Sequence, residues 1–247
     1  MKFLVKTLVI IFYIFTILNV KAEEYSLFNN IDYRLKAGVN LGASTPMPIP
    51  NRLSNLLWSP NIGPFIELSI VVFPDSNIGL SAGTKIEYKK MDVSASVYQL
   101  YSEVNIDNLL TKGYFTGTNE THLDVSYLTI PLQGIYKINH NLEFVLGFFA
   151  SFNLDGNFYG AVKNGYIRAG DPTGERTDIE FSEFDFSDEL RNLDWGCIGG
   201  INTYLTKKLY LNFQINLSLS SLLNTNFAGI PYKLYNLYSS LGLMYNI

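Results

Sequence analysis

The sequence predicts an all-β fold: a transmembrane antiparallel up-and-down β-barrel of about eight strands. The first observation behind this is a composition low in charge, with 16% charged and 15% aromatic residues among 247. The second is that no apolar run beyond the N-terminus approaches the ~20 residues of a membrane-spanning helix. The third is a hydrophobic period of two, which lets only every second residue face lipid.

The predicted strands show this period clearly. In the first one, Tyr33, Leu35 and Ala37 share one face, while Arg34 and Lys36 share the other. Each stretch has about 9–13 residues, which is the length that a tilted strand needs to cross a membrane. The predicted strands are 33–44, 62–72, 78–88, 128–138, 142–153, 194–202, 209–220 and 237–247.

The connections between these strands alternate in length. Short turns are expected at 74–77, 139–141 and 206–208, and long polar loops at 45–60, 89–121, 154–193 and 222–233. Short periplasmic turns and long extracellular loops are typical of outer-membrane barrels. The pattern therefore predicts an even number of strands, with both chain ends on the periplasmic side.

The two faces of the strands indicate lipid outside and a narrow lumen inside. The polar face is rich in Gly, Asn and Ser, which suit a cramped interior. A soluble lipocalin-like barrel, the alternative, would show Lys, Glu and Thr there. Aromatic residues at the ends of the apolar face predict two interfacial girdles, one of Tyr33, Tyr136, Phe144 and Tyr245, the other of Tyr88, Phe152, Trp195 and Tyr235.

The N-terminus has the layout of a cleavable signal peptide. Lys2 and Lys6 precede the apolar stretch 8–20, and Val20 and Ala22 occupy the −3 and −1 positions of a cleavage site. The predicted domains are a signal peptide at 1–22 and a barrel at 23–247. An uncleaved membrane anchor is the alternative.

We expect the mature protein to begin at Glu23 and to fractionate with the outer membrane, because a signal peptide directs export and the strands then insert. Mass spectrometry of the N-terminal peptide measures this. An intact Met1 terminus recovered from the inner membrane would contradict it.

The inward face carries charges of both signs. These candidate lumen residues are Arg34, Lys36, Glu67, Lys85, Glu87, Lys137 and Glu143. A lone charge in a narrow interior is costly, so we expect these groups to pair across strands and to plug the lumen. The inward amides expected to supply the remaining hydrogen bonds are Gln133, Asn202, Asn212, Gln214 and Asn216.

Candidate catalytic groups are few, and no enzymatic activity is expected. His140 lies in a predicted turn, while His122, Asp124 and Ser126 share one strand face. Alternate residues on a strand lie about 6.6 Å apart and point in parallel, which is wrong for a proton relay. No zinc-ligand spacing or phosphate-binding loop occurs, so neither metal nor cofactor is predicted. The acidic segment 154–193 lacks calcium-loop spacing, which favours a solvated loop over a cation site.

Four stretches resemble the PorT-like family of outer-membrane β-barrels of the Bacteroidota: Lys36–Gly42, Tyr127–Leu132, Asp194–Gly200, and Leu209–Leu222 with the last strand. The resemblance implies an outer-membrane barrel and supplies no catalytic residues. The family takes its name from a protein involved in protease secretion, but membership does not carry that role over. The chain ends in Ile247, where the family usually ends in Phe.

The last strand also resembles the signal read by the barrel-assembly machinery, with Ser240, Gly242, Tyr245 and Ile247 at strand spacing. An ordinary amphipathic strand is the alternative. The other expected partners are outer-membrane lipid and a surface protein that contacts loops 89–121 and 154–193. The net charge of −4 and the absence of a basic stripe argue against nucleic acid. The predicted function is an interaction scaffold with a plugged lumen, and the alternative is a small-solute channel.

Overall fold

The computed structural model describes residues 31–247, except 60, 75–76, 107–108, 140 and 228, so the predicted signal peptide and its cleavage site lie outside the described residues. The described chain is built almost entirely of strands. They are β1 (Ile31–Pro46), β2 (Leu53–Ser59), β3 (Gly63–Val72), β4 (Ile78–Ile106), β5 (Leu109–Asn139), β6 (Leu142–Ala169), β7 (Arg176–Asp185), β8 (Leu193–Tyr204), β9 (Leu209–Ser218) and β10 (Leu234–Asn246), with one 3₁₀ turn, η2 (Ser187–Glu189). Among these residues no helix is both long and apolar enough to span a membrane.

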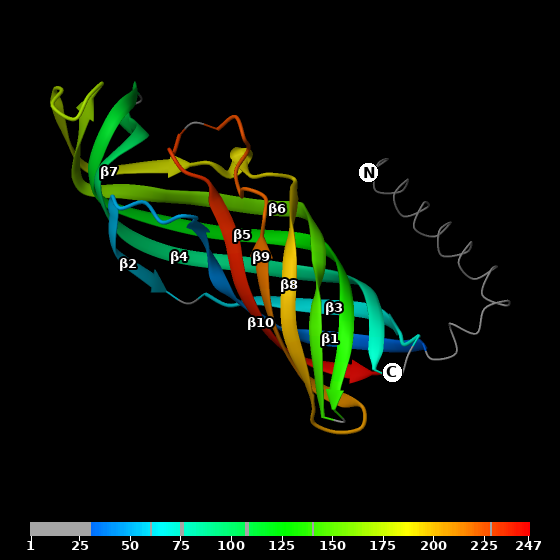
Figure 1. Cartoon of the computed structure of the whole chain (residues 1–247). Helices are drawn as coiled ribbons and strands as arrows, with labels where there is room; N and C mark the ends of the chain where they lie inside the picture. Colours follow the sequence, from blue (N-terminus) through cyan, green and yellow to red (C-terminus); the bar gives the residue numbers. More distant parts are fainter. Residues whose placement is uncertain (1–30, 60, 75–76, 107–108, 140, 228) are drawn as a thin grey trace, which may run out of the picture.

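Eight of the described strands close into a ring of antiparallel hydrogen bonds, which confirms the predicted fold class. The order is β1–β3–β4–β5–β6–β8–β9–β10, and β10 pairs back onto β1 from Arg34↔Asn246 to Pro46↔Leu234. The backbone N–H of Ile247 donates to the carbonyl of Tyr33 at 2.9 Å, so the C-terminus lies beside the start of β1. Figure 1 shows the ring as a tilted, elongated barrel.

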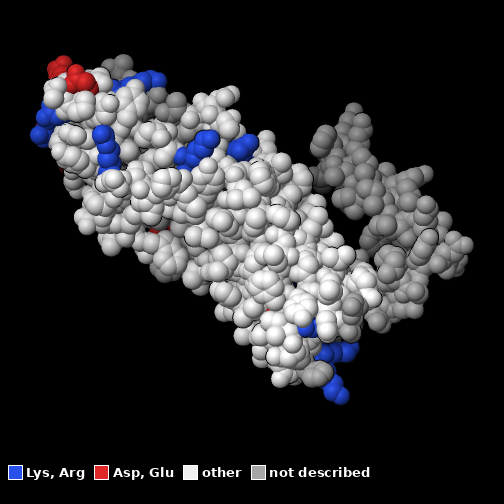
Figure 2. Space-filling view, in the orientation of Figure 1, with Lys and Arg blue, Asp and Glu red and all other residues white. Residues whose placement is uncertain are grey.

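The two faces of the ring differ as the alternation predicts. Outward side chains such as Leu146 and Leu68 are 60% and 53% exposed, while inward Arg34 and Lys36 are 1% and 2% exposed. The girdle aromatics Tyr33, Phe144 and Trp195 all face outward. In Figure 2 the middle of the wall is nearly free of charged residues, which gather toward the two ends. Such a wall suits a hydrocarbon layer bounded by two polar interfaces.

The prediction that 89–121 and 154–193 are polar loops is wrong. The pairing of β4 with β5 runs from Ile78↔Tyr136 to Ile106↔Leu109, so both strands continue far beyond the ring. β6 likewise continues to Ala169 and carries β7 on its free side, while β2, inside the predicted loop 45–60, pairs with β4. We call this part the extension: β2, β7 and residues 89–106, 109–126 and 154–169 of β4, β5 and β6. Figure 1 shows it at the upper left, beyond the other strands.

The extension exists because β4 keeps its period of two beyond Lys89, while the polarity of its two faces is exchanged. The inward face changes from polar to apolar, and the outward face changes from apolar to polar. Up to this residue β4 buries polar groups and exposes apolar ones. Beyond it, Met91 and Ala95 are 2% and 6% exposed, while the side chains of Lys90 and Asp124 are 29% and 46% exposed and form an ion pair. A strand that leaves lipid for water must turn its apolar side chains inward. The change of sign at Lys89 resembles the end of a strand, which is why the sequence predicts a loop there.

Apolar side chains inside the extension form two clusters. The lower cluster comprises Met91, Leu123, Val125, Tyr127, Phe158, Leu190, Leu222, Leu223 and Leu234. The upper cluster comprises Val97, Leu100, Phe115, Val162, Ile167 and Ile179. Phe184 and Tyr232 pack against both clusters. The extension therefore has an apolar core like that of a soluble protein, and this core lies above the polar lumen.

Candidate functional site

The carboxylate of Glu143 is a buried charge of the lumen that several side chains hold. Arg34 donates to both of its oxygens, from Nη1 at 2.8 Å and from Nη2 at 3.1 Å. Asn202 Nδ2 and the Tyr204 hydroxyl donate to the same carboxylate at 2.9 and 2.8 Å. The ion pair joins β1 to β6, which are not neighbours in the ring, so it crosses the lumen. Four donors thus hold this buried anion.

Two further pairs form among the predicted lumen charges, one between neighbouring strands and one within β4. Lys36 Nζ lies 3.0 Å from Glu67 Oε1, its neighbour in register on β3. Lys85 Nζ lies 2.6 Å from Glu87 Oε2, two residues along β4. Asn40 donates to the same Glu87 oxygen at 2.9 Å. Each carboxylate therefore meets a cation and, at Glu87, an additional amide.

A fourth pair joins Lys89 to Asp194. Lys89 is not among the predicted lumen charges, because it lies in the predicted loop 89–121. Lys89 Nζ lies 3.5 Å from Asp194 Oδ2 and 3.9 Å from Glu87 Oε1. It also lies over the rings of Tyr127, Phe149 and Tyr238, at 4.9, 5.2 and 5.7 Å. Lys89 follows Lys85 and Glu87 in the period of two, so the same alternation predicts that it points into the lumen.

Asp194 is the anion of this fourth pair and is held by neutral donors as well. The hydroxyls of Ser218 and Ser220 each donate to it at 2.7 Å, and Asn236 Nδ2 donates at 2.9 Å. These donors come from β9, the residues that follow it, and β10. The side chain is therefore tied to three parts of the ring at the outer end of the lumen.

The buried charges of the lumen balance. Among the described residues, the buried cations are Arg34, Lys36, Lys85 and Lys89, and the buried anions are Glu67, Glu87, Glu143 and Asp194. Each of these side chains is at most 5% exposed. Burial of a charge is tolerated when a partner and hydrogen bonds compensate for the lost hydration. The lumen contains this compensation.

Lys137 differs from the other predicted lumen charges. It lies opposite Glu143 in the β5–β6 register, yet its ammonium lies 3.5 Å from the centre of the Phe73 ring. Phe73 belongs to a buried apolar group with Val71, Ile135 and Val145. The sequence does not predict this group, because the inward face is expected to be polar along its whole length.

The predicted amides divide into two sets. Asn202 donates to Glu143, Asn212 donates to Asn202 at 2.6 Å, and Asn216 donates to Ser240 at 2.9 Å. The Nε2 atoms of Gln133 and Gln214 find no hydrogen-bond partner among the described residues. The asparagines therefore extend the network, and the glutamines do not.

His122, Asp124 and Ser126 do not act on one another. His122 Nδ1 lies 2.6 Å from Asp92 Oδ1, and the ring stacks on Tyr159 at 5.2 Å. Asp124 pairs with Lys90, and the Ser126 hydroxyl donates to a backbone carbonyl, that of Asp155, at 3.1 Å. These outward groups belong to a polar band on the outer faces of β4, β5 and β6, formed by the ion pairs Lys90–Asp124 and Lys163–Glu120 and by the hydrogen bond between His122 and Asp92. The band marks where the outer wall meets water.

The acidic segment uses its carboxylates in local turns. Hydrogen bonds from the hydroxyl and N–H of Thr173 hold the pKa of Asp171 below its usual value. The hydroxyl and N–H of Ser187 do the same for the pKa of Asp185. Over the part of the chain that the structure describes, no three His, Cys, Asp or Glu side chains converge as metal ligands would.

The residues of the proposed assembly signal take distinct places on β10 and at its end. Ser240 is fully buried, donates to Asn40 at 2.7 Å and accepts from Asn216. A Cβ at position 242 would lie 2.8 Å from the Ala37 carbonyl oxygen and 2.9 Å from the Phe65 ring, so glycine is required there. Tyr245 and Ile247 face outward, 45% and 65% exposed.

The comparison with known families now decides the identity of this barrel. Residues 21–224 match the family described as outer membrane protein beta-barrel domain. The chain belongs to this family. It is therefore a protein of the outer membrane, and the apolar belt of the ring is the surface that meets lipid.

Three solved structures with a similar arrangement are remote in sequence. Ail, the attachment invasion locus protein of Yersinia pestis, in complex with the heparin analogue sucrose octasulfate, is 7% identical with a TM-score of 0.39; the match covers 88% of this chain and 97% of Ail. Neisserial surface protein A is 10% identical with a TM-score of 0.33, and the coverages are 88% and 97%. The outer membrane protease OmpT from Escherichia coli is 13% identical with a TM-score of 0.32, and the coverages are 91% and 99%. No curated protein sequence matches the chain.

Proposed function

We propose that this protein is a barrel closed to solutes, without enzymatic activity, that acts as a structural or interaction scaffold through its extension. The observation that carries the proposal is the balanced set of buried charges in the lumen, four of each sign. The interior of an eight-stranded barrel is just wide enough for side chains to fill. A network whose members are each at most 5% exposed is well suited to act as a plug.

The shape of the extension supports its role as the contact surface for a protein partner at the cell surface. β2 pairs only with β4, and β7 pairs only with β6, so each presents a free strand edge among the described residues. Free edges accept an added strand from a partner. Exposed apolar side chains at and near these edges, Leu57 at 69%, Tyr98 at 59% and Phe181 at 55%, add contact area.

Within its family we propose that the chain belongs with the PorT-like barrels of the Bacteroidota. The support is that each of the four resembling stretches lies on a strand or hairpin of the ring. Lys36–Gly42 lies in β1, Tyr127–Leu132 in β5 and Asp194–Gly200 in β8. The final stretch and the last strand pair as β9 and β10.

Planar-bilayer recording tests the closed lumen directly. We expect the purified, folded barrel to give no steady single-channel conductance, because the paired side chains occupy its cross-section. A known porin inserted into the same bilayer provides the control for insertion. Steady, reproducible conductance from the intact barrel would overturn the proposal and establish the small-solute channel instead.

A further inference from the structure

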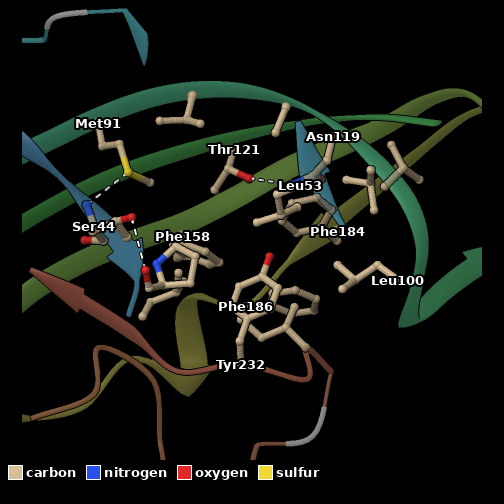
Figure 3. Close-up of a pocket in the computed structure, with 18 of the residues that line it drawn as sticks. Ser44, Leu53, Met91, Leu100, Asn119, Thr121, Phe158, Phe184, Phe186 and Tyr232 are labelled. Atoms are coloured by element: carbon tan, nitrogen blue, oxygen red, sulfur yellow. Dashed lines mark hydrogen bonds between the residues drawn. The ribbon is translucent and has the colours of Figure 1, made fainter. Parts of the chain in front are cut away.

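A cavity of about 270 Å³ in the extension is lined by residues of both clusters. Figure 3 shows the residues around it, with Met91 and Phe158 from the lower cluster and Leu100 from the upper one. Phe184 and Tyr232 line it from β7 and from the segment before β10. The interior of a protein is normally packed to crystal density, so an apolar space of this size suits a ligand.

The lining sets the chemistry of that ligand. It contains no lysine, arginine or histidine among the described residues, and its one acidic side chain is the exposed Glu183. Two of its polar groups already have partners: the Thr121 hydroxyl accepts from Asn119, and the Ser44 N–H points at the Met91 sulfur. The cavity therefore offers apolar contacts and no cation for an anionic group.

The lining also contains a neutral polar group that is free to bind. The hydroxyl of Tyr232 makes no hydrogen bond to any described residue, and burial raises the pKa of this side chain to about 12. At neutral pH the hydroxyl therefore keeps its proton and remains a donor or acceptor. A single neutral group of this kind suits an uncharged hydroxyl or ester oxygen.

The lining of the cavity extends along β4. Met91 and Leu100 both line it, on either side of the bulge between Val97 and Leu100. A flexible, unbranched chain follows such a path more easily than a compact, fused-ring molecule.

The cavity reaches the surface near the membrane. Leu56 and Trp58 line it and are still 47% and 43% exposed. The indole Nε1 of Trp58 donates to the Gly42 carbonyl at 3.2 Å, on β1 a short distance below Thr45, which pairs with the girdle residue Tyr235. The exposed part of the lining therefore lies at the level of the outer interface, where the chains of amphiphiles are available.

We propose that this cavity binds the unbranched apolar chain of an uncharged amphiphile, which enters from the outer face of the membrane. The inference goes beyond the scaffold role and holds whether or not the lumen conducts. Glu183, the one acidic residue of the lining, disfavours an anionic head group, because like charges repel.

The two tryptophans of the chain supply the experiment. Trp58 lines the cavity, whereas Trp195 faces lipid. Single-tryptophan variants, Trp195→Phe and Trp58→Phe, are placed in lipid nanodiscs and titrated with 12-bromododecan-1-ol, whose bromine quenches indole on contact. We expect Trp58 to be quenched saturably, at an alcohol-to-lipid ratio at least tenfold below that needed for Trp195. Equal quenching of the two tryptophans would mean that the alcohol only partitions into lipid, and would overturn the proposal.

Substitutions within the Trp195→Phe protein locate the site. Ala95→Phe fills the cavity and should raise the half-saturating ratio at least tenfold, while Ser94→Phe, on the opposite face of β4, should leave it unchanged. Val97→Phe is the second cavity-filling variant, and the shift in electrophoretic mobility on heating verifies that each barrel is folded. If both Ala95→Phe and Val97→Phe fold and leave the quenching of Trp58 unchanged, the alcohol does not bind in this cavity and the proposal is overturned.

The head group is tested with 12-bromododecanoate. We expect the carboxylate to need a several-fold higher ratio than the alcohol, and Glu183→Gln to reduce that difference. A carboxylate that binds as well as the alcohol would overturn the assignment of an uncharged ligand.

Discussion

Replacing Glu143 with leucine should lower the free energy of unfolding by about 3–5 kcal/mol, because the buried Arg34 guanidinium then keeps only the more distant and partly exposed carboxylate of Asp32, at 3.8 Å. Arg34 is 1% exposed and Glu143 is fully buried. The substitution also removes the acceptor for Asn202 and for the Tyr204 hydroxyl. Urea titration of the barrel folded in lipid vesicles measures the effect.

The double variant Arg34→Leu, Glu143→Leu is the matched control. It removes both charges together, so neither is left unpaired. Replacing a buried ion pair by apolar residues is often close to neutral, and we expect the double variant to recover most of the lost stability. Equal losses in the single and double variants would show that side-chain volume, and not charge pairing, governs this part of the lumen.

The part of the fold that the sequence predicts correctly is the part that lies in lipid, because there the outward face of every strand is apolar. From β1 to β10, each strand of the ring shows its apolar face to hydrocarbon, so the period of two and its sign together define strand positions and the closed ring. At Lys89 and Lys90 the sign changes while the period continues. A search for one fixed sign ends the strand there and misses a pairing that continues to Ile106↔Leu109.

The candidate sites divide in the same way. Lumen charges could be predicted because direction follows from alternation, and the structure places Arg34 with Glu143, and Lys36 with Glu67. The partner of each charge could not be predicted, since it depends on the register of strands far apart in sequence. The cavity could not be predicted either, because it depends on how many elements pack together. Its lining comes from β1, β2, β4, β5, β6, β7 and the segment before β10.

Leu146→Arg should cost about 2–4 kcal/mol of stability, because an arginine near the middle of the apolar belt places an unpaired cation in hydrocarbon. Leu146 is 60% exposed on the outer face of β6, between the girdle residues Phe144 and Phe152. Phe213→Arg, on β9, should have a comparable effect. The same urea titration in lipid vesicles measures both.

Asn157→Arg is the matched control on the same strand and the same outer face. Asn157 lies beyond the change of sign, opposite Asp124 in the β5–β6 register, within the polar band. An arginine there meets water and a carboxylate, so its cost should be below about 1 kcal/mol. The difference between positions 146 and 157 therefore measures where hydrocarbon ends along β6. A cost at position 157 as large as that at 146 would mean that lipid reaches the extension, and the apolar interior above Lys89 would then need another explanation.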